Sequence, residues 1–170
     1  NSKLKIIIID KQSKKILENP KIDGREVALT HRSANILKEI GAWNQIPAKL
    51  ISPIKEARVL NGVSKYFLDF KHQQIQKNCL GYIIPNYLIK KHLYKRLKKL
   101  SNVHLISEVN CISIDANNSE YSSVQLSNGK KIKASLIVAS DSRFSKARSM
   151  MGISAFTHDF NKNMIVCRME

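Results

Sequence analysis

Residues 4–10 read Leu-Lys-Ile-Ile-Ile-Ile-Asp, and this stretch indicates the fold more directly than any other part of the chain. A near-continuous run of β-branched residues is typical of a strand that is covered on both faces in a parallel sheet. Asp10 follows at the carboxyl end of this strand, where open α/β sheets bind their ligands. In a dinucleotide-binding βαβ unit an acid placed after a strand accepts hydrogen bonds from a ribose diol; an ordinary turn or capping aspartate is the alternative interpretation.

Outward from this strand, the sequence predicts an alternation of helices and strands. Helices are predicted over residues 30–40, 86–100 and 145–151. Strands are predicted over residues 56–60, 66–70, 81–84, 103–106, 109–114, 122–126, 131–133, 136–139 and 164–167. The pair Asn61-Gly62 predicts a hairpin turn, Gly41 predicts a helix end, and residues 11–24 and 42–55 are expected to be irregular. These elements together predict an α/β fold with some antiparallel pieces.

The charge balance is strongly positive. The 170 residues include 29 Lys and Arg against 13 Asp and Glu, a formal net charge of +16, which favours anionic partners such as nucleic acid or a membrane surface. The densest basic run, residues 90–99, lies on a predicted helix whose apolar positions Ile89, Leu93, Leu97 and Leu100 form one stripe. A solvated helix face therefore also explains this run. A nucleic-acid-binding domain rests on charge alone, and because no recognisable module accompanies it we predict no nucleic-acid partner.

Other signals limit the location and the cysteine chemistry. No apolar run reaches the ~18–20 residues of a membrane span, and the first residues do not fit a signal peptide, so we expect a cytoplasmic protein. Cys79, Cys111 and Cys167 lack metal-ligand spacing and are expected to be buried thiols. We predict no metal site, and no histidine is assigned a catalytic role.

Three further segments carry residues that bind anionic or sugar-containing ligands. Arg25 follows a Gly-containing turn, and its guanidinium either contacts a phosphate or lies on the surface as an ordinary arginine. Asn86 begins the basic helix, where it either caps the helix or donates its side-chain amide to a ligand. Asp141 follows the predicted strand 136–139, where it either binds sugar-like hydroxyls or caps the next helix.

In their order these segments resemble the flavin-dependent aromatic hydroxylases, in particular the UbiH/VisC type of ubiquinone biosynthesis and its UbiM-like branch. The resemblance covers nearly all of residues 3–168. Its first motif, DxRxxAL followed by S, LG and W, matches Asp23, Arg25, Ala28, Leu29, Ser33, Leu37, Gly41 and Trp43. The later motifs match Pro53-Ile54, the segment Gly81-Tyr82-Ile83-Ile84-Pro85-Asn86, and residues 128–148.

The resemblance implies a role in FAD binding for five residues. Asp10 would hold the adenosine ribose, and Arg25 would contact the phosphates or the ribityl chain. Asn86 stands where an amide of the family contacts the cofactor, the backbone of Val109 would face the adenine, and Asp141 would bind the ribityl hydroxyls.

The resemblance also implies the fold and its division into domains. The fold would be a partial FAD/NAD(P)-binding Rossmann-like (PHBH-type) α/β fold with a portion of the mixed-sheet substrate domain. Residues 1–50 and 81–150 would belong to the FAD-binding domain. Residues 51–80 and 151–170 would begin strands of the substrate domain.

The chemistry implied by the resemblance is flavin-dependent hydroxylation of the aromatic ring of a ubiquinone precursor, with NAD(P)H as reductant and O2 as oxygen source. The flavin carries such chemistry, so no protein nucleophile is required. A prenylated phenol or quinone precursor is the expected substrate, with peripheral contact to the inner membrane and with a ubiquinone-biosynthesis complex as further partners.

Two departures from the family pattern lead to an alternative function. Ser140 and Ser142 replace the two glycines of the family's GADG, which restricts the backbone, and the family's opening GxGxxG is absent from the chain. These departures predict that the isolated chain is inactive. They also leave open a catalytically inactive scaffold in a ubiquinone-synthesis complex.

Overall fold

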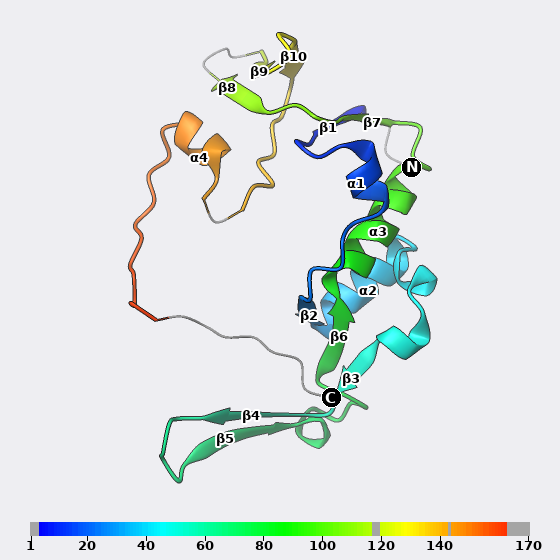
Figure 1. Cartoon of the computed structure of the whole chain (residues 1–170), viewed down its shortest axis with the longest axis vertical. Coiled ribbons are helices and arrows are strands. Elements are labelled where there is room, and N and C mark those ends of the chain that lie inside the picture. Colours follow the sequence, from blue (N-terminus) through cyan, green and yellow to red (C-terminus); the bar gives the residue numbers. More distant parts are fainter. Residues whose placement is uncertain (1–3, 117–119, 143, 163–170) are drawn as a thin grey trace. The chain divides into compact units, whose positions relative to one another are not determined.

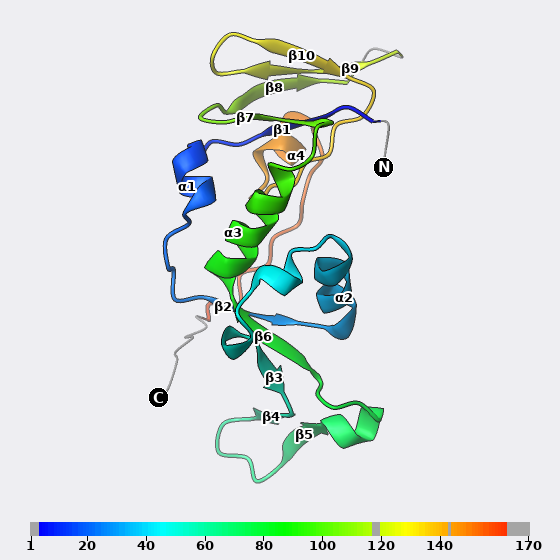
Figure 2. The same ribbon diagram turned by 90° about the vertical axis from the view of Figure 1, so that its right-hand side faces the viewer.

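The computed structural model describes residues 4–116, 120–142 and 144–162 (Figure 1). The chain divides into two compact units, residues 1–108 and residues 109–170, and each is described by itself. The opening strand, β1 (Ile6–Ile9), belongs to the first unit and pairs in parallel with β7 (Val103–Ile106). The predicted parallel strand is confirmed, and Figure 2 shows the two strands side by side.

The prediction that both faces of β1 are covered is wrong. Ile6 and Ile7 are exposed, and only the second half of the strand is partly buried. The reason is that β7 is the one strand bonded to β1 among the residues that the structure describes. A parallel strand is buried on both faces only when helices pack against both sides of a wider sheet.

Residues 11–24 contain a short helix that the sequence analysis did not predict. In α1 (Lys14–Glu18) the Ser13 side chain accepts a hydrogen bond from the backbone N–H of Ile16 and so caps the helix. A serine followed by Lys, Leu and Glu is a favourable helix start, which the polar composition of the segment concealed. Lys98 holds the end of this helix through an ion pair of 2.7 Å to Glu18.

A three-stranded antiparallel sheet organises the middle of the first unit. Its order is β2 (Glu26–Leu29), β6 (Gly81–Pro85) and β3 (Ser52–Ile54). The extended segment at 81–84 is confirmed, whereas β2 and β3 were not predicted as strands. Two short 3-10 helices, η1 (Trp43–Gln45) and η2 (Ala48–Leu50), also lie in the region expected to be irregular.

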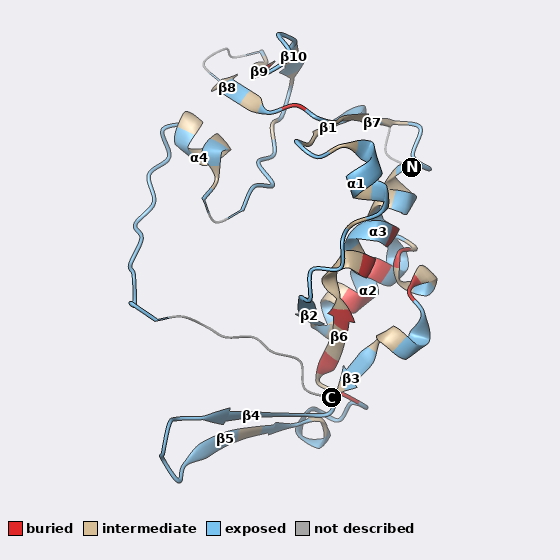
Figure 3. Ribbon diagram, in the orientation of Figure 1, coloured by how far each residue is buried: buried red, intermediate tan, exposed pale blue. Residues whose placement is uncertain are grey.

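Two helices pack beside this sheet. Thr30 caps α2 (His31–Glu39) by accepting from the backbone N–H of Ser33, and Gly41 follows the helix end as predicted. The basic helix α3 (Asn86–Leu97) follows β6 directly. The core comprises Ile46, Ile84 and Leu88, with partly buried side chains around them, and Figure 3 shows the buried residues gathered on β6, α2 and α3.

The predicted apolar stripe of α3 is only partly correct. Leu88 and His92 are the buried residues of the helix, whereas Leu93 and Leu100 are exposed and the helix ends at Leu97. The core-facing side is fixed by β6, because Ile84 is buried at the end of that strand and Leu88 and His92 continue from it at intervals of four.

The predicted hairpin is confirmed by β4 (Glu56–Leu60) and β5 (Phe67–Lys71), which a 3-10 helix, η3 (His72–Ile75), follows. Alternation places Ala57, Val59, Leu68 and Phe70 on one apolar and exposed face. The opposite face carries the ion pair of Arg58 and Asp69.

The second unit holds an antiparallel sheet in the order β10 (Lys131–Ala134), β9 (Ser122–Leu126) and β8 (Cys111–Asp115), and the short helix α4 (Lys146–Met150). The predicted strands at 109–114, 122–126 and 131–133 and the helix at 145–151 are confirmed within a few residues.

The predicted strand at residues 136–139 is wrong. Leu136 and Val138 are 77% and 74% exposed, and the segment is bonded to no strand among the described residues. A strand needs a partner for its backbone donors and acceptors, so apolar composition alone does not form one. The predicted strand at 164–167 lies outside the described residues. Cys79 is buried as expected and Cys111 half-buried, while Cys167 lies outside the described part.

No described helix has the length and apolar character needed to cross a membrane. In the part of the chain that the structure covers, no group of three histidine, cysteine or acidic side chains is placed to hold a metal ion.

Candidate functional site

The most densely connected polar cluster of the first unit is centred on Asp23. The Arg25 guanidinium donates to Asp23 Oδ2 from Nη2 at 2.8 Å and from Nε at 3.0 Å. The Asn86 side-chain amide donates to the same oxygen at 3.0 Å. Lys90 Nζ lies 3.8 Å from Asp23 Oδ2, and the backbone N–H of Arg25 donates to Oδ1 at 3.2 Å. Two of the predicted cofactor residues, Arg25 and Asn86, are therefore brought together.

The strand register explains why residues so distant in sequence meet. Glu26 of β2 lies opposite Pro85 of β6, so the residues just before and just after this pair are neighbours. The backbone N–H of Asn86 donates to the carbonyl of Arg25 at 2.9 Å, which extends the sheet by one bond. Gly24, with φ of +67°, supplies the left-handed turn that places Asp23 beside Arg25.

Asp23 is fully ionised at physiological pH. The Asn86 amide and then the Arg25 guanidinium donate to it and lower the pKa of its carboxyl to about 2. The side chain of Asp23 is only 24% exposed, whereas that of Arg25 is 68% exposed. The cluster therefore exposes the Arg25 guanidinium to solvent, while the mostly covered Asp23 carboxylate accepts hydrogen bonds from it and from Asn86.

Asn86 does not cap α3. The helix has no side-chain cap, and Asn86 is its first residue, with its amide directed at Asp23. Of the two interpretations that the sequence allowed, capping is wrong. Sequence reasoning also missed Asp23 and Lys90 as members of the cluster. The spacing Asp-Gly-Arg was the available signal for Asp23, because an aspartate two residues before an arginine bonds it easily across a glycine turn.

Asp10 lies at the carboxyl end of β1, as predicted. Its backbone N–H donates to the Ile106 carbonyl at 3.0 Å, and its Oδ1 accepts from the backbone N–H of Gln12 at 2.7 Å. The backbone N–H of Glu108 donates to the Gln12 carbonyl at 3.3 Å. Asp10 therefore stands at the shared carboxyl edge of two parallel strands, where ligands of α/β sheets bind. Val109 follows Glu108 as a buried residue that begins the second unit.

Asp141 takes part in a local cluster of the second unit. Its Oδ2 accepts from the Ser145 hydroxyl at 2.9 Å and from the backbone N–H of Ala147 at 3.0 Å, and these bonds lower the pKa of its carboxyl. The Ser145 hydroxyl accepts from the backbone N–H of Arg148 at 3.0 Å and caps α4. Both of these hydrogen bonds go to one oxygen of the Asp141 carboxylate, and the residue is exposed.

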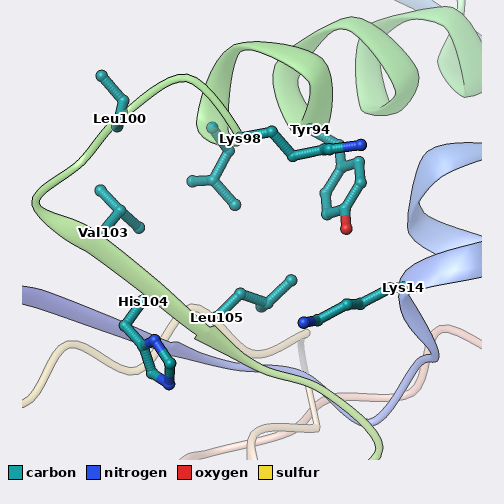
Figure 4. Close-up of a pocket in the computed structure, with 8 residues that line it drawn as sticks. Lys14, Tyr94, Lys98, Leu100, Val103, His104 and Leu105 are labelled. Carbon is teal, nitrogen blue, oxygen red and sulfur yellow. The ribbon is translucent and has the colours of Figure 1, made fainter.

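A cavity of about 220 Å³ lies between α1, α3 and β7 and contains none of the predicted cofactor residues. Figure 4 shows Leu105 and Val103 of β7 facing Tyr94 of α3 and Lys98, the residue after that helix, while His104 points to the other side of the strand. Half of the lining residues are aliphatic and two are lysines, and the lining offers no carboxylate for a ribose.

Comparison with known proteins gives a consistent result. The chain is 39% identical over 173 residues to ubiquinone hydroxylase UbiM of Neisseria meningitidis, which covers 99% of this chain and 37% of the relative. It is 26% identical to ubiquinone biosynthesis monooxygenase COQ6 of Drosophila melanogaster, over 86% of this chain and 31% of the relative. The chain belongs to the UbiH/COQ6 family of FAD-dependent ubiquinone hydroxylases. No model of a protein family matches it.

The fold is shared with solved flavin enzymes. PqsL of Pseudomonas aeruginosa superposes with a TM-score of 0.71 at 11% identity, over 92% of this chain and 41% of that protein. At this identity the likeness shows the fold alone, a partial FAD-dependent monooxygenase fold of the PHBH type. The resemblance to the ubiquinone hydroxylases and the predicted fold class are both confirmed. The chain spans about 37% of the length of its UbiM relative.

The residues present suit the FAD of this family. FAD carries a pyrophosphate, a ribose diol and a ribityl chain, which require cationic donors and carboxylate acceptors. Arg25 provides an exposed planar fork of donors, and Asp10 provides a carboxylate at a strand edge. In the second unit, taken by itself, Asp141 offers a carboxylate whose two hydrogen bonds occupy one oxygen. The donor set therefore fits the cofactor in chemical type.

Proposed function

We propose that the protein to which this chain belongs is an FAD-dependent monooxygenase that hydroxylates the aromatic ring of a ubiquinone precursor. NAD(P)H would be the reductant and O2 the source of the oxygen atom. The observation that carries this proposal is the 39% identity to ubiquinone hydroxylase UbiM across 99% of the chain. A prenylated phenol or quinone precursor is the substrate class that fits the names of these relatives, a ubiquinone hydroxylase and a ubiquinone biosynthesis monooxygenase.

The chain would contribute five residues to the cofactor site. Asp10 would accept hydrogen bonds from the ribose, and Asp141 from the ribityl hydroxyls. Arg25 would neutralise and orient the phosphates or the ribityl chain, Asn86 would donate its amide, and the backbone of Val109 would face the adenine. The bound flavin supplies the hydride acceptance and oxygen activation, while these residues bind and orient it.

No side chain of the described residues is needed as a nucleophile or metal ligand in this proposal. The protein's contribution is to hold the cofactor and the ring in one relative position and to keep water away from the reacting atoms. Arg25 would also supply the planar set of N–H donors that suits a phosphate group.

The test uses the complete protein, supplied with FAD, NAD(P)H, a prenylated phenol and 18O2. We expect a product that contains one 18O atom, measured by mass spectrometry, with NAD(P)H consumed in equal amount. A flavin-loaded protein that oxidises NAD(P)H without labelled product contradicts ring hydroxylation. A folded protein that FAD cannot reconstitute supports the scaffold alternative instead.

We also propose that the protein is cytoplasmic and contacts the inner membrane peripherally, because the substrate class carries a prenyl tail and the chain has a net charge of +16. Co-sedimentation with vesicles should rise as anionic lipid replaces neutral lipid and should fall in high salt. Sedimentation that ignores the anionic lipid content would contradict this contact.

A further inference from the structure

One oxygen atom, Oδ2 of Asp23, is the meeting point of donors from two segments of the chain. Arg25 Nη2 and Nε donate to it from the turn before β2, and Asn86 Nδ2 donates to it from the start of α3. Asn86 is 63 residues further along the chain. Such convergence on a single carboxylate oxygen links the two groups that the proposed function assigns to FAD.

The two sides of this cluster differ in exposure. The Asp23 side chain is mostly covered, whereas the Arg25 guanidinium is largely exposed and donates two hydrogen bonds that meet at one carboxylate oxygen. A free arginine side chain samples many rotamers, and its ordering costs free energy when a ligand binds. The contact of two guanidinium donors with Oδ2 orders the guanidinium before any ligand arrives, which lowers that cost.

We propose that Asp23 is a positioning residue, which fixes the Arg25 guanidinium and the Asn86 amide in the arrangement that binds FAD. This inference rests on the proposed function, because it takes Arg25 and Asn86 as contacts of the cofactor. Asp23 itself needs no contact with the cofactor. Its carboxylate acts through its two partners, and its ionised state persists because its pKa is lowered to about 2.

A competing electrostatic effect means that the direction in which FAD affinity changes, when Asp23 is neutralised, decides between two roles of Asp23. The Asp23 carboxylate is an anion close to a group that would bind an anionic cofactor, so it also repels the phosphates. If Asp23 only kept the Arg25 donors from reaching the cofactor, neutralisation of Asp23 would free the guanidinium and tighten FAD binding. If Asp23 positions Arg25 and Asn86, its neutralisation weakens FAD binding. Lys90, 3.8 Å from the same oxygen, partly offsets the negative charge and favours the second outcome.

The test is the dissociation constant of FAD for the apoprotein of the complete protein, measured by flavin fluorescence in wild type and in Asp23→Asn. We expect binding about tenfold weaker in Asp23→Asn, by analogy with metal sites, where removal of a partner that orients a metal-ligating side chain typically costs ~10–100-fold in metal affinity. Asp23→Glu keeps the charge and should recover part of the affinity.

A matched control is available at the other end of α3. Glu18, the last residue of α1, is an exposed carboxylate that pairs at 2.7 Å with Lys98, which follows the end of α3 opposite to Asn86. Glu18→Gln removes the same charge and an ion pair of the same kind. We expect its FAD dissociation constant to stay within about twofold of wild type, as for exposed ion pairs in general.

A second readout does not require FAD. The Nε–H group of Arg25 donates to Asp23, so its NMR signal in the apoprotein should be shifted and protected from exchange with water. Asp23→Asn should return this signal to the position and exchange rate of a solvated arginine. Glu18→Gln should leave it unchanged, and the melting temperature of the apoprotein should change little in either variant.

The outcomes separate the two proposals. Unchanged or tighter FAD binding in Asp23→Asn, or an equal loss in Glu18→Gln, overturns the positioning role of Asp23. A wild-type protein that binds no FAD contradicts the proposed function. In that case the Arg25 signal still decides whether Asp23 fixes the guanidinium, because it is read without the cofactor.

Discussion

The two aspartate clusters of this chain are assembled in opposite ways. Asp23 gathers donors from residues two and 63 positions away, and the pairing of β2 with β6 brings them together. Asp141 gathers its donors from residues four and six positions away, within the turn that starts α4. The first cluster is a product of tertiary structure, whereas the second forms wherever its own turn forms.

This difference determines how each cluster can be disturbed. The largest contribution to the lowered pKa of Asp23 comes from the Asn86 amide, which lies where β6 ends and α3 begins. The largest contribution to the lowered pKa of Asp141 comes from the backbone N–H of Ala147, six residues further along the chain. Remote changes in the first unit should therefore affect Asp23, and only local changes should affect Asp141.

The largest expected effect comes from Gly81 in β6. A Cβ atom at this position would lie 2.4 Å from the backbone carbonyl oxygen of Leu29, so Gly81→Val forces β2 and β6 apart. Overpacking of this kind typically costs ~1–3 kcal/mol or more. We expect a melting temperature several degrees lower and much weaker FAD binding, measured by calorimetry and fluorescence titration.

The control for this substitution is Gly62→Ala at the tip of the β4–β5 hairpin. Nothing lies within 4 Å of its Cβ position, although its φ of +53° carries a cost of about 1–2 kcal/mol for alanine. Its FAD affinity should be that of wild type. Equal losses of FAD affinity in both variants would show that the β2–β6 contact is not special.

An intermediate effect is expected from pH, through His92. This histidine is buried on α3, and its Nδ1 has no hydrogen-bond partner. Burial, and then the charges of Lys95 and Lys91, lower its pKa in the folded protein. The unfolded chain therefore binds the proton more readily, so stability is present above about pH 6.5 and falls as the pH is lowered through the unfolded value.

His92→Leu should remove this dependence, because no ionisable group remains at the position. Unfolding by urea at pH 7.5 and pH 5.5 measures the difference, with His104→Gln, an exposed histidine on β7, as the control. We expect wild type and His104→Gln to lose stability at pH 5.5 by similar amounts and His92→Leu to lose less. Equal losses in all three proteins would contradict an unfavourable buried charge at His92.

The smallest effect is expected from Ser145→Ala in the second unit. This change removes the cap of α4 and one donor to Asp141, at a typical cost of ~1 kcal/mol. The backbone N–H of Ala147 still holds the Asp141 carboxylate, so FAD binding should persist. A loss of FAD affinity as large as that expected for Gly81→Val would contradict the claim that the Asp141 cluster is less sensitive to substitution than the Asp23 cluster.

Local signals made part of this structure predictable from the sequence. Asn61-Gly62 determined a hairpin, Gly41 ended a helix, and Asp10 was correctly placed at the end of a parallel strand. Asp141 accepts from Ser145 and from the backbone N–H of Ala147 in α4, although Ser145 is the residue that caps this helix. Each of these features depends on residues close together in the chain.

The remaining features depend on partners that the local pattern does not reveal. The sequence allows Asn86 as a helix cap, but the register of β2 and β6 gives it Asp23 as a partner instead. The buried side of α3 follows β6 rather than the leucine spacing. Residues 136–139 have the composition of a strand, yet no described strand pairs with them. Tertiary context decided each case.

The central claim is that this chain supplies residues for an FAD site, and the most direct test is the visible spectrum of the complete protein. We predict that the purified wild-type protein shows a bound-flavin spectrum, that Asp141→Ala loses it, and that Ser145→Ala keeps it. A colourless, folded wild-type protein that added FAD cannot reconstitute would contradict the claim.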